Sequence, residues 1–120
     1  NAWKPLVESL VTFQKEPQNQ SKALQVLNEL INDDSLESNS ISGYIVNDDE
    51  ALMKIIECLS SPEPKVRTNT IALLNNLIRL QPTKVQAIFL DSRAQKLLLN
   101  LEDDPVKVIQ IYFYNMIPSK

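Results

Sequence analysis

Histidine is absent from this 120-residue chain, and cysteine occurs once, as Cys58. Without an imidazole the chain lacks the commonest general base and the commonest nitrogen ligand for zinc. A lone cysteine cannot form an internal disulfide, and a thiol nucleophile would need a histidine base. Cys58 lies in an apolar run, so we expect a small buried side chain. The sequence therefore predicts no catalytic residue, no metal site and no cofactor.

Glycine also occurs once, as Gly43. So few glycines disfavour tight β-hairpins and phosphate-binding loops, because both need a positive φ. No apolar run approaches the roughly 20 residues of a membrane span, so we expect no membrane insertion. The formal net charge is −3, and no cluster of lysine and arginine stands out, which predicts no nucleic-acid partner.

Two acidic clusters, 48–50 and 102–104, each precede a segment with helical spacing. A calcium loop would need alternating oxygen ligands and a central glycine, and neither cluster has them. Acidic residues at the start of a helix accept hydrogen bonds from free backbone N–H groups and oppose the positive end of the helix dipole. We therefore expect both clusters to cap helices, with Asp48 or Asp49 as an N-cap.

Apolar residues make up 43% of the chain and recur at helical spacing in one segment after another. Prolines separate these segments, because a proline cannot continue a helix. Leu52, Ile55 and Ile56 are expected to face the core from one helix, and Leu74 and Leu77 from the next. The sequence thus predicts an all-α protein.

The two ends of the chain are less regular. Trp3 lies in a helical pattern that breaks at Pro17 and resumes after Ser21, which we expect to be the N-cap of the next helix. The segment 106–117 mixes β-branched and aromatic residues and could by itself form a strand. Its position after a proline break predicts a helix instead.

The order of a medium helix, a proline break and a longer helix repeats. The segment "EALMKIIECLSSPEPKVRTNTIALLNNLI" is followed about 42 residues later by "AQKLLLNLEDDPVKVIQIYFYNMI", which aligns Leu59 with Leu101 and Lys65 with Lys107. A period in this range is typical of a helical solenoid. We expect a single domain, a fragment of a longer protein, over 1–120. Its parts are a partial repeat at 1–31, a loop and short helix at 32–47, and repeats at 48–81 and 82–118.

The "SSPEPKVR" break and the "ALLNNLI" run resemble an armadillo repeat, as does "KVQAIFLDSRAQKLLLNLEDDP". The resemblance implies an armadillo-like right-handed solenoid of about two full repeats plus a partial first one, with HEAT repeats as the near alternative. The glycine usual between the first two helices is replaced near 91–93. Ala72 stands four residues before Asn76, where transport-receptor repeats carry a tryptophan, which argues against nuclear import.

The run "LIRLQPTKVQAIFLDSRAQKLLLNLEDDPVKV" is similar to armadillo-type nucleotide exchange factors of the 70-kDa heat-shock chaperones. In that eukaryotic family the curved solenoid clasps a lobe of the chaperone's nucleotide-binding domain and loosens ADP. The resemblance implies a chaperone regulator that binds a folded partner. The alternative is an armadillo-type scaffold that holds an extended peptide. The expected compartment is the cytoplasm, with the lumen of the endoplasmic reticulum as the alternative.

A polar stripe follows the long helices of the successive repeats, which in a solenoid line the concave surface. Amides can bond a partner's backbone without reading its sequence, and a tyrosine adds apolar contact with a polar tip. The predicted partner-binding residues are Lys22, Gln25, Glu29, Thr68, Asn69, Asn75, Asn76, Arg79, Lys107, Gln110 and Tyr114. The alternative is a solvated face that binds nothing.

The remaining aromatic residues are expected to be core rather than site: Trp3, Phe89, Tyr112 and Phe113. Tyr112 and Phe113 lie near the end of the chain, where a further repeat would cover them in a longer solenoid. An uncovered apolar face promotes association. The sequence therefore predicts that this chain can self-associate through its terminal repeat.

Overall fold

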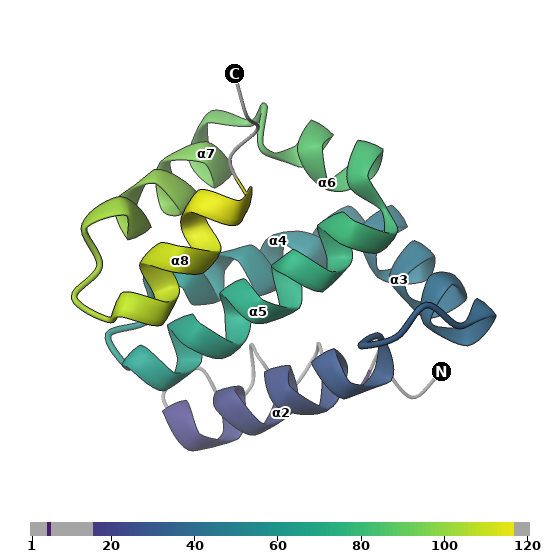
Figure 1. The fold of residues 1–120 in the computed structure, drawn as a ribbon, viewed down its shortest axis with the longest axis horizontal. Helices are drawn as coiled ribbons and strands as arrows, with labels where there is room; N and C mark the ends of the chain where they lie inside the picture. Colours follow the sequence, from purple (N-terminus) through teal and green to yellow (C-terminus); the bar gives the residue numbers. More distant parts are fainter. Residues whose placement is uncertain (1–4, 6–15, 117–120) are drawn as a thin grey trace.

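The structure is a computed structural model that describes Pro5 and residues 16–116. Over these residues every regular element is a helix and no strand occurs, so the all-α prediction is confirmed for this part (Figure 1). The α-helices are α2 (Pro17–Leu30), α3 (Leu36–Asn47), α4 (Asp49–Glu57), α5 (Pro64–Leu80), α6 (Pro82–Ile88), α7 (Ser92–Leu99) and α8 (Lys107–Met116). Two short 3₁₀ segments, η1 (Cys58–Ser60) and η2 (Asn100–Asp103), continue α4 and α7. Trp3 and the helix expected around it lie outside the described residues.

Prolines and aspartates begin several of these helices. The helices α2, α5 and α6 each start at a proline, where the missing N–H needs no partner. Asp48 is the N-cap of α4, as one of the two expected candidates, and its Oδ1 accepts from the Ala51 N–H at 3.1 Å. Asp91 caps α7 in the same way, accepting from the Arg93 N–H at 2.9 Å.

The start of α2 differs from the sequence-based expectation. A break at Pro17 and an N-cap at Ser21 were expected, but α2 begins at Pro17 and Ser21 is buried inside it. The expectation was wrong because proline at the first helical position favours a helix, whereas only proline in the interior breaks one. Ser21 is therefore a packing residue of α2.

The segment 32–47 contains a turn followed by a full helix of 12 residues, α3. Ser35 is its N-cap, and its hydroxyl accepts from the Ser38 N–H at 3.0 Å. Ile45 and Val46 bury the end of α3 against the rest of the molecule. Most of the segment that was expected to be a loop with a short helix is therefore one helix.

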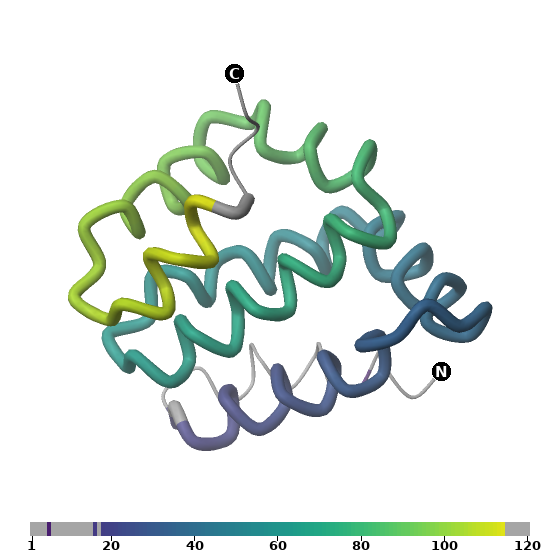
Figure 2. The backbone as a smooth tube through the Cα atoms, in the orientation of Figure 1, coloured from purple at the N-terminus to yellow at the C-terminus, as the bar shows by residue number. Residues whose placement is uncertain are grey.

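The helices α2, α5 and α8 form one layer, and we call them the long helices because each stands in the place of the longer helix of a predicted repeat. By length α8, with 10 residues, is shorter than α3, with 12. In Figure 1, α2, α5 and α8 lie side by side with α5 in the middle, and α4 lies behind α5. The tube in Figure 2 follows the chain from α2 through α3 and α4 at the back to α5 at the front. The described fold measures 36 × 36 × 24 Å, and its shortest extent matches two layers of helices about 10–12 Å thick.

The core lies between these layers, and α4 and α5 contribute the largest shares of it. Leu52, Ile55 and Ile56 of α4 are at most 1% exposed, and Leu74 and Leu77 of α5 are fully buried. All five were expected to face the core. Because the apolar stripe of α5 faces the rear layer, its polar side is left for contact with α2 and α8.

The segment that could have been a strand is helix α8. Ile109 and Phe113, four residues apart, are fully buried, whereas Val108, Ile111 and Tyr114 are 41%, 55% and 60% exposed. Residues four positions apart lie on the same face of a helix, so Ile109 and Phe113 both face the core. Val108, Ile111 and Tyr114 lie on the other faces of α8. Of the aromatic residues expected in the core, Phe113 is fully buried, and Phe89 and Tyr112 are partly buried.

Cys58 is a buried thiol, as the sequence predicts. Burial in the core, helped by the nearby Glu57 carboxylate, raises the pKa of Cys58 from 9.0 to about 12. The thiolate is the reactive form, so at pH 8 its population falls by about a thousandfold. We expect the folded chain to resist an aromatic disulfide reagent at pH 8 and to react fully in urea. Rapid stoichiometric reaction of the folded chain would show that Cys58 is accessible.

Candidate functional site

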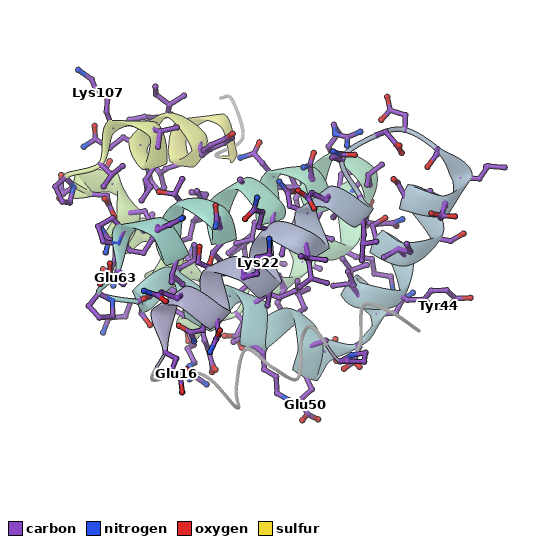
Figure 3. All side chains as sticks on the ribbon, turned by 90° about the horizontal axis from the view of Figure 1, so that it is seen from below. Glu16, Lys22, Tyr44, Glu50, Glu63 and Lys107 are labelled. Atoms are coloured by element: carbon purple, nitrogen blue, oxygen red, sulfur yellow. The ribbon has the colours of Figure 1, made fainter. Side chains whose placement is uncertain are left out.

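The eleven predicted partner-binding residues all fall on the layer of long helices. Three come from α2, five from α5 and three from α8, and these helices lie side by side. Figure 3 shows Lys22 on α2 and Lys107 at the start of α8. The structure therefore places the predicted residues on neighbouring helices. Those on α2 and α8 are mostly exposed, whereas the asparagines of α5 form hydrogen bonds to the neighbouring helices.

On the outer helices the predicted residues are mostly exposed. Lys22, Gln25 and Glu29 of α2 and Lys107 and Tyr114 of α8 are all exposed. None of these five makes a side-chain hydrogen bond or ion pair among the described residues. The Tyr114 ring does contact the Phe113 ring edge to face, with centroids 5.3 Å apart. These side chains are available to a partner.

On α5 the asparagines bond to neighbouring helices. Asn69 Nδ2 donates to the backbone carbonyl oxygen of Ser21 at 3.1 Å and to its hydroxyl oxygen at 2.7 Å. Asn76 Nδ2 donates to Asn28 Oδ1 at 2.6 Å, also on α2. Asn75 Nδ2 donates to the carbonyl oxygen of Tyr112 on α8 at 3.4 Å. These amides hold the three long helices together.

Two further predicted residues bond within their own part of the chain. The Thr68 hydroxyl donates to the Pro64 carbonyl one turn earlier at 2.8 Å. Gln110 Nε2 donates to the Glu102 carbonyl at 3.3 Å, in the 3₁₀ segment before α8. Both contacts stabilise the start of a long helix.

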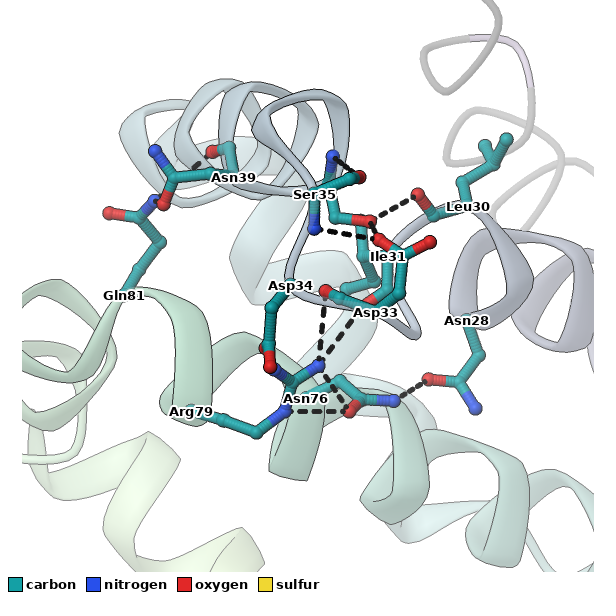
Figure 4. A network of polar contacts seen from close by, with 11 residues as sticks. Asn28, Leu30, Ile31, Asp33, Asp34, Ser35, Asn39, Asn76, Arg79 and Gln81 are labelled. Atoms are coloured by element: carbon teal, nitrogen blue, oxygen red, sulfur yellow. Dashed lines mark hydrogen bonds and ion pairs between the residues drawn. The ribbon is translucent and has the colours of Figure 1, made fainter.

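Arg79 ties the end of α5 to the turn after α2 (Figure 4). Its Nε and Nη2 donate to Asn76 Oδ1 at 3.3 and 3.1 Å. Nη2 also donates to the Ile31 carbonyl oxygen at 3.4 Å, and Nη1 forms an ion pair with Asp34. The side chain is 39% exposed, so the ion pair lies near the surface. Arg79 thus satisfies the carbonyls left free where α2 ends.

Asp33 organises the same turn from its other side. Its Oδ1 accepts from the Ser35 N–H at 3.0 Å and from the Ser38 hydroxyl at 2.6 Å. Hydrogen bonds from Ser35 and Ser38 are the main causes that lower the pKa of Asp33 from 3.8 to about 2, with Arg79 a smaller one. Donors to a carboxylate favour its charged form. The turn is therefore best ordered when Asp33 is ionised.

This shift predicts a pH dependence. A lowered folded-state pKa gives stability that is present above the unfolded value of 3.8 and is lost as pH falls toward about 2. The variant Asp33→Asn should be less stable at pH 6 and should lose less stability than the wild type between pH 4 and 2. Urea midpoints at pH 6, 4 and 2 measure this. Asp103→Asn, an exposed position on η2, is the control. An Asp33→Asn slope equal to that of the wild type would contradict the assignment.

Sequence reasoning missed the most buried ion pair. Arg67 Nε lies 2.8 Å from Asp104 Oδ2 and Arg67 Nη2 lies 3.2 Å from Asp104 Oδ1, with side chains 12% and 5% exposed. Asp104 also accepts from the Val106 N–H at 2.9 Å, so it does act near the start of a helix as expected. Its distant partner gave no sequence signal, because the two residues are 37 positions apart.

Gln81 was also missed. Its Nε2 donates to the backbone carbonyl and the side-chain oxygen of Asn39, at 3.2 Å each, and to the Ser42 hydroxyl at 3.3 Å. These bonds attach the turn between α5 and α6 to α3. A glutamine just after a helix gave no reason to expect that role.

Within 16–116, no group of three or more potential metal-binding side chains lies together. In the same part of the chain, no helix has the length and apolar character needed to cross a membrane.

Comparison of the chain with family models, curated proteins and solved structures finds no match in any of the three.

Proposed function

We propose that the chain is a non-catalytic protein-binding module of the armadillo type that grips its partner across α2, α5 and α8. The arrangement supports this: α2, α5 and α8 lie side by side in one layer with α4 behind α5, as expected of stacked armadillo repeats. The repeated order of helices and proline breaks supports a right-handed solenoid of about two repeats plus a partial first one.

The observation that carries the proposal is the distribution of free and bonded polar groups on this layer. The exposed side chains lie on the outer helices, represented by Lys22 and Glu29 on α2 and by Lys107 and Tyr114 on α8. The α5 amides between them already bond to the neighbouring helices. A partner would therefore be held mainly at the two sides of the layer.

Such a distribution favours a folded partner over an extended peptide. A folded domain is broad enough to touch both outer helices, whereas a peptide lying along the layer depends on free amides in its middle. The resemblance of 77–108 to chaperone exchange factors supplies the candidate, the nucleotide-binding domain of a 70-kDa heat-shock chaperone. Gripping that domain across α2 and α8 would loosen ADP.

The test is binding to a purified chaperone nucleotide-binding domain, with and without ADP, by biolayer interferometry. We expect binding that weakens with ADP, and a loss of affinity of at least about tenfold in the double variant Lys107→Glu with Tyr114→Ala, because both exposed side chains face the partner. A fluorescent ADP analogue should leave the domain faster when the chain is added.

The control is Lys96→Glu with Gln86→Ala, two exposed positions on α7 and α6 and therefore outside α2, α5 and α8. It should leave binding within about twofold, since surface changes outside an interface have small effects. Absence of binding to the domain, with recovery from a lysate of unrelated proteins that share a short linear segment, would instead assign a peptide-holding scaffold.

A further inference from the structure

The helix α8 carries apolar side chains on two opposite sides. Ile109 and Phe113 are fully buried, whereas Val108, Ile111 and Tyr114 are 41%, 55% and 60% exposed. At about 100° per residue, the exposed stripe is centred about 180° from the buried one. A helix whose outer side faces only water normally carries polar or charged residues there. We call Val108, Ile111 and Tyr114 the outer stripe of α8; its composition is that of a helix covered on both sides.

The position of α8 in the layer explains why its outer stripe lacks a cover. In Figure 1, α5 lies between α2 and α8, so α8 stands at the edge of the layer. Tyr112 and Phe113 were expected to be the apolar residues that a further repeat would cover, but Phe113 is fully buried and Tyr112 is partly buried. The uncovered apolar surface of α8 is therefore its outer stripe.

The charge of α8 is placed against its own helix dipole. Lys107 is the one charged residue of the helix and stands in its first turn, where the dipole is positive, and the last turn holds no basic residue. In Figure 3 the Lys107 side chain points away from the molecule. A second helix running antiparallel beside α8 would bring its last carbonyl groups, the negative end of its dipole, next to Lys107.

The outer stripe is also symmetric along the helix, as a contact between two identical surfaces requires. Val108 lies three residues before Ile111, and Tyr114 lies three residues after it. A two-fold axis through Ile111 would set two copies of α8 antiparallel, with Ile111 against Ile111 and the small Val108 of each copy against the large Tyr114 ring of the other. The same axis places Lys107 of each copy beside the last turn of the other α8. One arrangement therefore covers both stripes and offsets the charge at both ends.

We infer that the outer stripe of α8 is a homodimer interface, on which a second copy of the chain packs its own α8 antiparallel about a two-fold axis at Ile111. Burial of the two apolar stripes drives association, and Lys107 against the opposite helix end sets the direction.

The dimer has a consequence for binding that rests on the proposed function. Lys107 and Tyr114 belong to the proposed binding face, so the dimer covers the α8 side of that face. A partner that binds the single chain would then shift the equilibrium away from the dimer by mass action.

The direct test is sedimentation equilibrium of the full chain over about a hundredfold range of concentration. We expect the average mass to rise from that of one chain toward that of two. Ile111→Glu sets two carboxylates against each other at the axis and should weaken dimerisation by at least about tenfold. Its far-ultraviolet circular dichroism should match the wild type, because Ile111 is 55% exposed. A single chain at every concentration, or a dimer that Ile111→Glu leaves intact, would overturn the inference.

A matched control separates the outer stripe from a general effect of added charge. Leu36→Glu makes the same kind of change on α3, where Leu36 is 88% exposed, and should alter dimerisation by less than about twofold. Equal losses in Ile111→Glu and Leu36→Glu would mean that the chains associate less because their net charge is higher, and the α8 interface would be rejected.

Cysteine variants test the antiparallel arrangement without adding charge. On the axis, Ile111→Cys should form a disulfide with its own copy under mild oxidation, whereas the native Cys58 is buried. Two Val108→Cys sites would lie about 9 Å apart along the helix direction, beyond the about 7 Å between Cα atoms that a disulfide spans. Val108→Cys should therefore link only when mixed with Tyr114→Cys. Self-linking of Val108→Cys as fast as that of Ile111→Cys would overturn the antiparallel dimer.

These measurements use the chain alone, so their result is independent of the chaperone assay. A dimer that Ile111→Glu dissociates, without binding to the chaperone domain, would reject the chaperone as partner and keep the interface. Binding of the chaperone domain by a chain that stays single at every concentration would keep the proposed function and reject the interface.

Discussion

Replacement of Asp104 by alanine is expected to destabilise the fold by about 3–5 kcal/mol, a large share of the about 5–15 kcal/mol that a small domain has. Both oxygens of Asp104 bond the Arg67 guanidinium, at 2.8 and 3.2 Å, and both side chains are largely buried. Truncation would leave a buried positive charge without its partner, and that desolvated charge is the source of the cost. The free energy of unfolding from urea denaturation measures it.

The neighbouring aspartate provides the matched control. Asp103 is exposed, and Asp103→Ala should change the free energy of unfolding by about 0.5 kcal/mol or less. The double variant Arg67→Met with Asp104→Leu should recover much of the loss, because it removes both buried charges together. If Asp104→Ala costs no more than Asp103→Ala, the pair does not hold the fold together.

The position of Arg67 explains why this pair matters. Arg67 Nη1 also donates to the Ser61 carbonyl at 2.9 Å, in the loop before α5. One guanidinium therefore joins three parts of the chain: that loop, the start of α5 and the turn that leads into α8. Such a link fixes the position of one long helix relative to the next.

Much of the fold could be predicted because helix boundaries depend on local chemistry. Asp48 correctly predicted the start of α4, and the spacing of apolar residues correctly predicted which faces of α4 and α5 are buried. The same local reasoning failed at Pro17, because the effect of a proline depends on whether it stands at the first position of a helix or in its interior. The helical state of α8 was predicted from its place after a proline break rather than from its composition.

The sequence predicts which helices carry the candidate residues but not which contacts these residues make. The sequence pattern placed eleven polar residues on the long helices, and the structure sets those helices side by side. It could not show that Asn69 and Asn76 would bond to α2, because those bonds span 48 positions and depend on how two helices slide against each other. Contacts between two helices depend on how the helices pack, and the apolar periodicity of one helix carries no information about that packing.

The two adjacent asparagines of α5 now have a physical explanation. Asn75 donates to α8 and Asn76 donates to α2, so consecutive amides point to the two opposite neighbours. Residues next to each other on a helix differ by about 100° in direction. A pair of amides in an otherwise apolar run can therefore join the middle helix to both outer ones.

Replacement of Phe113 by alanine is expected to cost about 3–5 kcal/mol, because a fully buried aromatic ring is lost and a cavity remains. Phe113 lies on α8, which packs against α5, and Ile109 is the fully buried residue one turn earlier. Loss of the ring should loosen α8 before the rest of the fold. The free energy of unfolding, together with protease cleavage within α8, measures both effects.

Tyr114 is the matched control, because it is the next residue and also aromatic but is 60% exposed. Tyr114→Ala removes the edge-to-face contact between the two rings and should cost about 1 kcal/mol or less. It should nevertheless weaken partner binding, whereas Phe113→Ala would weaken binding only by disordering α8. A Tyr114→Ala variant as unstable as Phe113→Ala would mean that Tyr114 holds α8 in place, and that its exposed ring serves the fold rather than a partner.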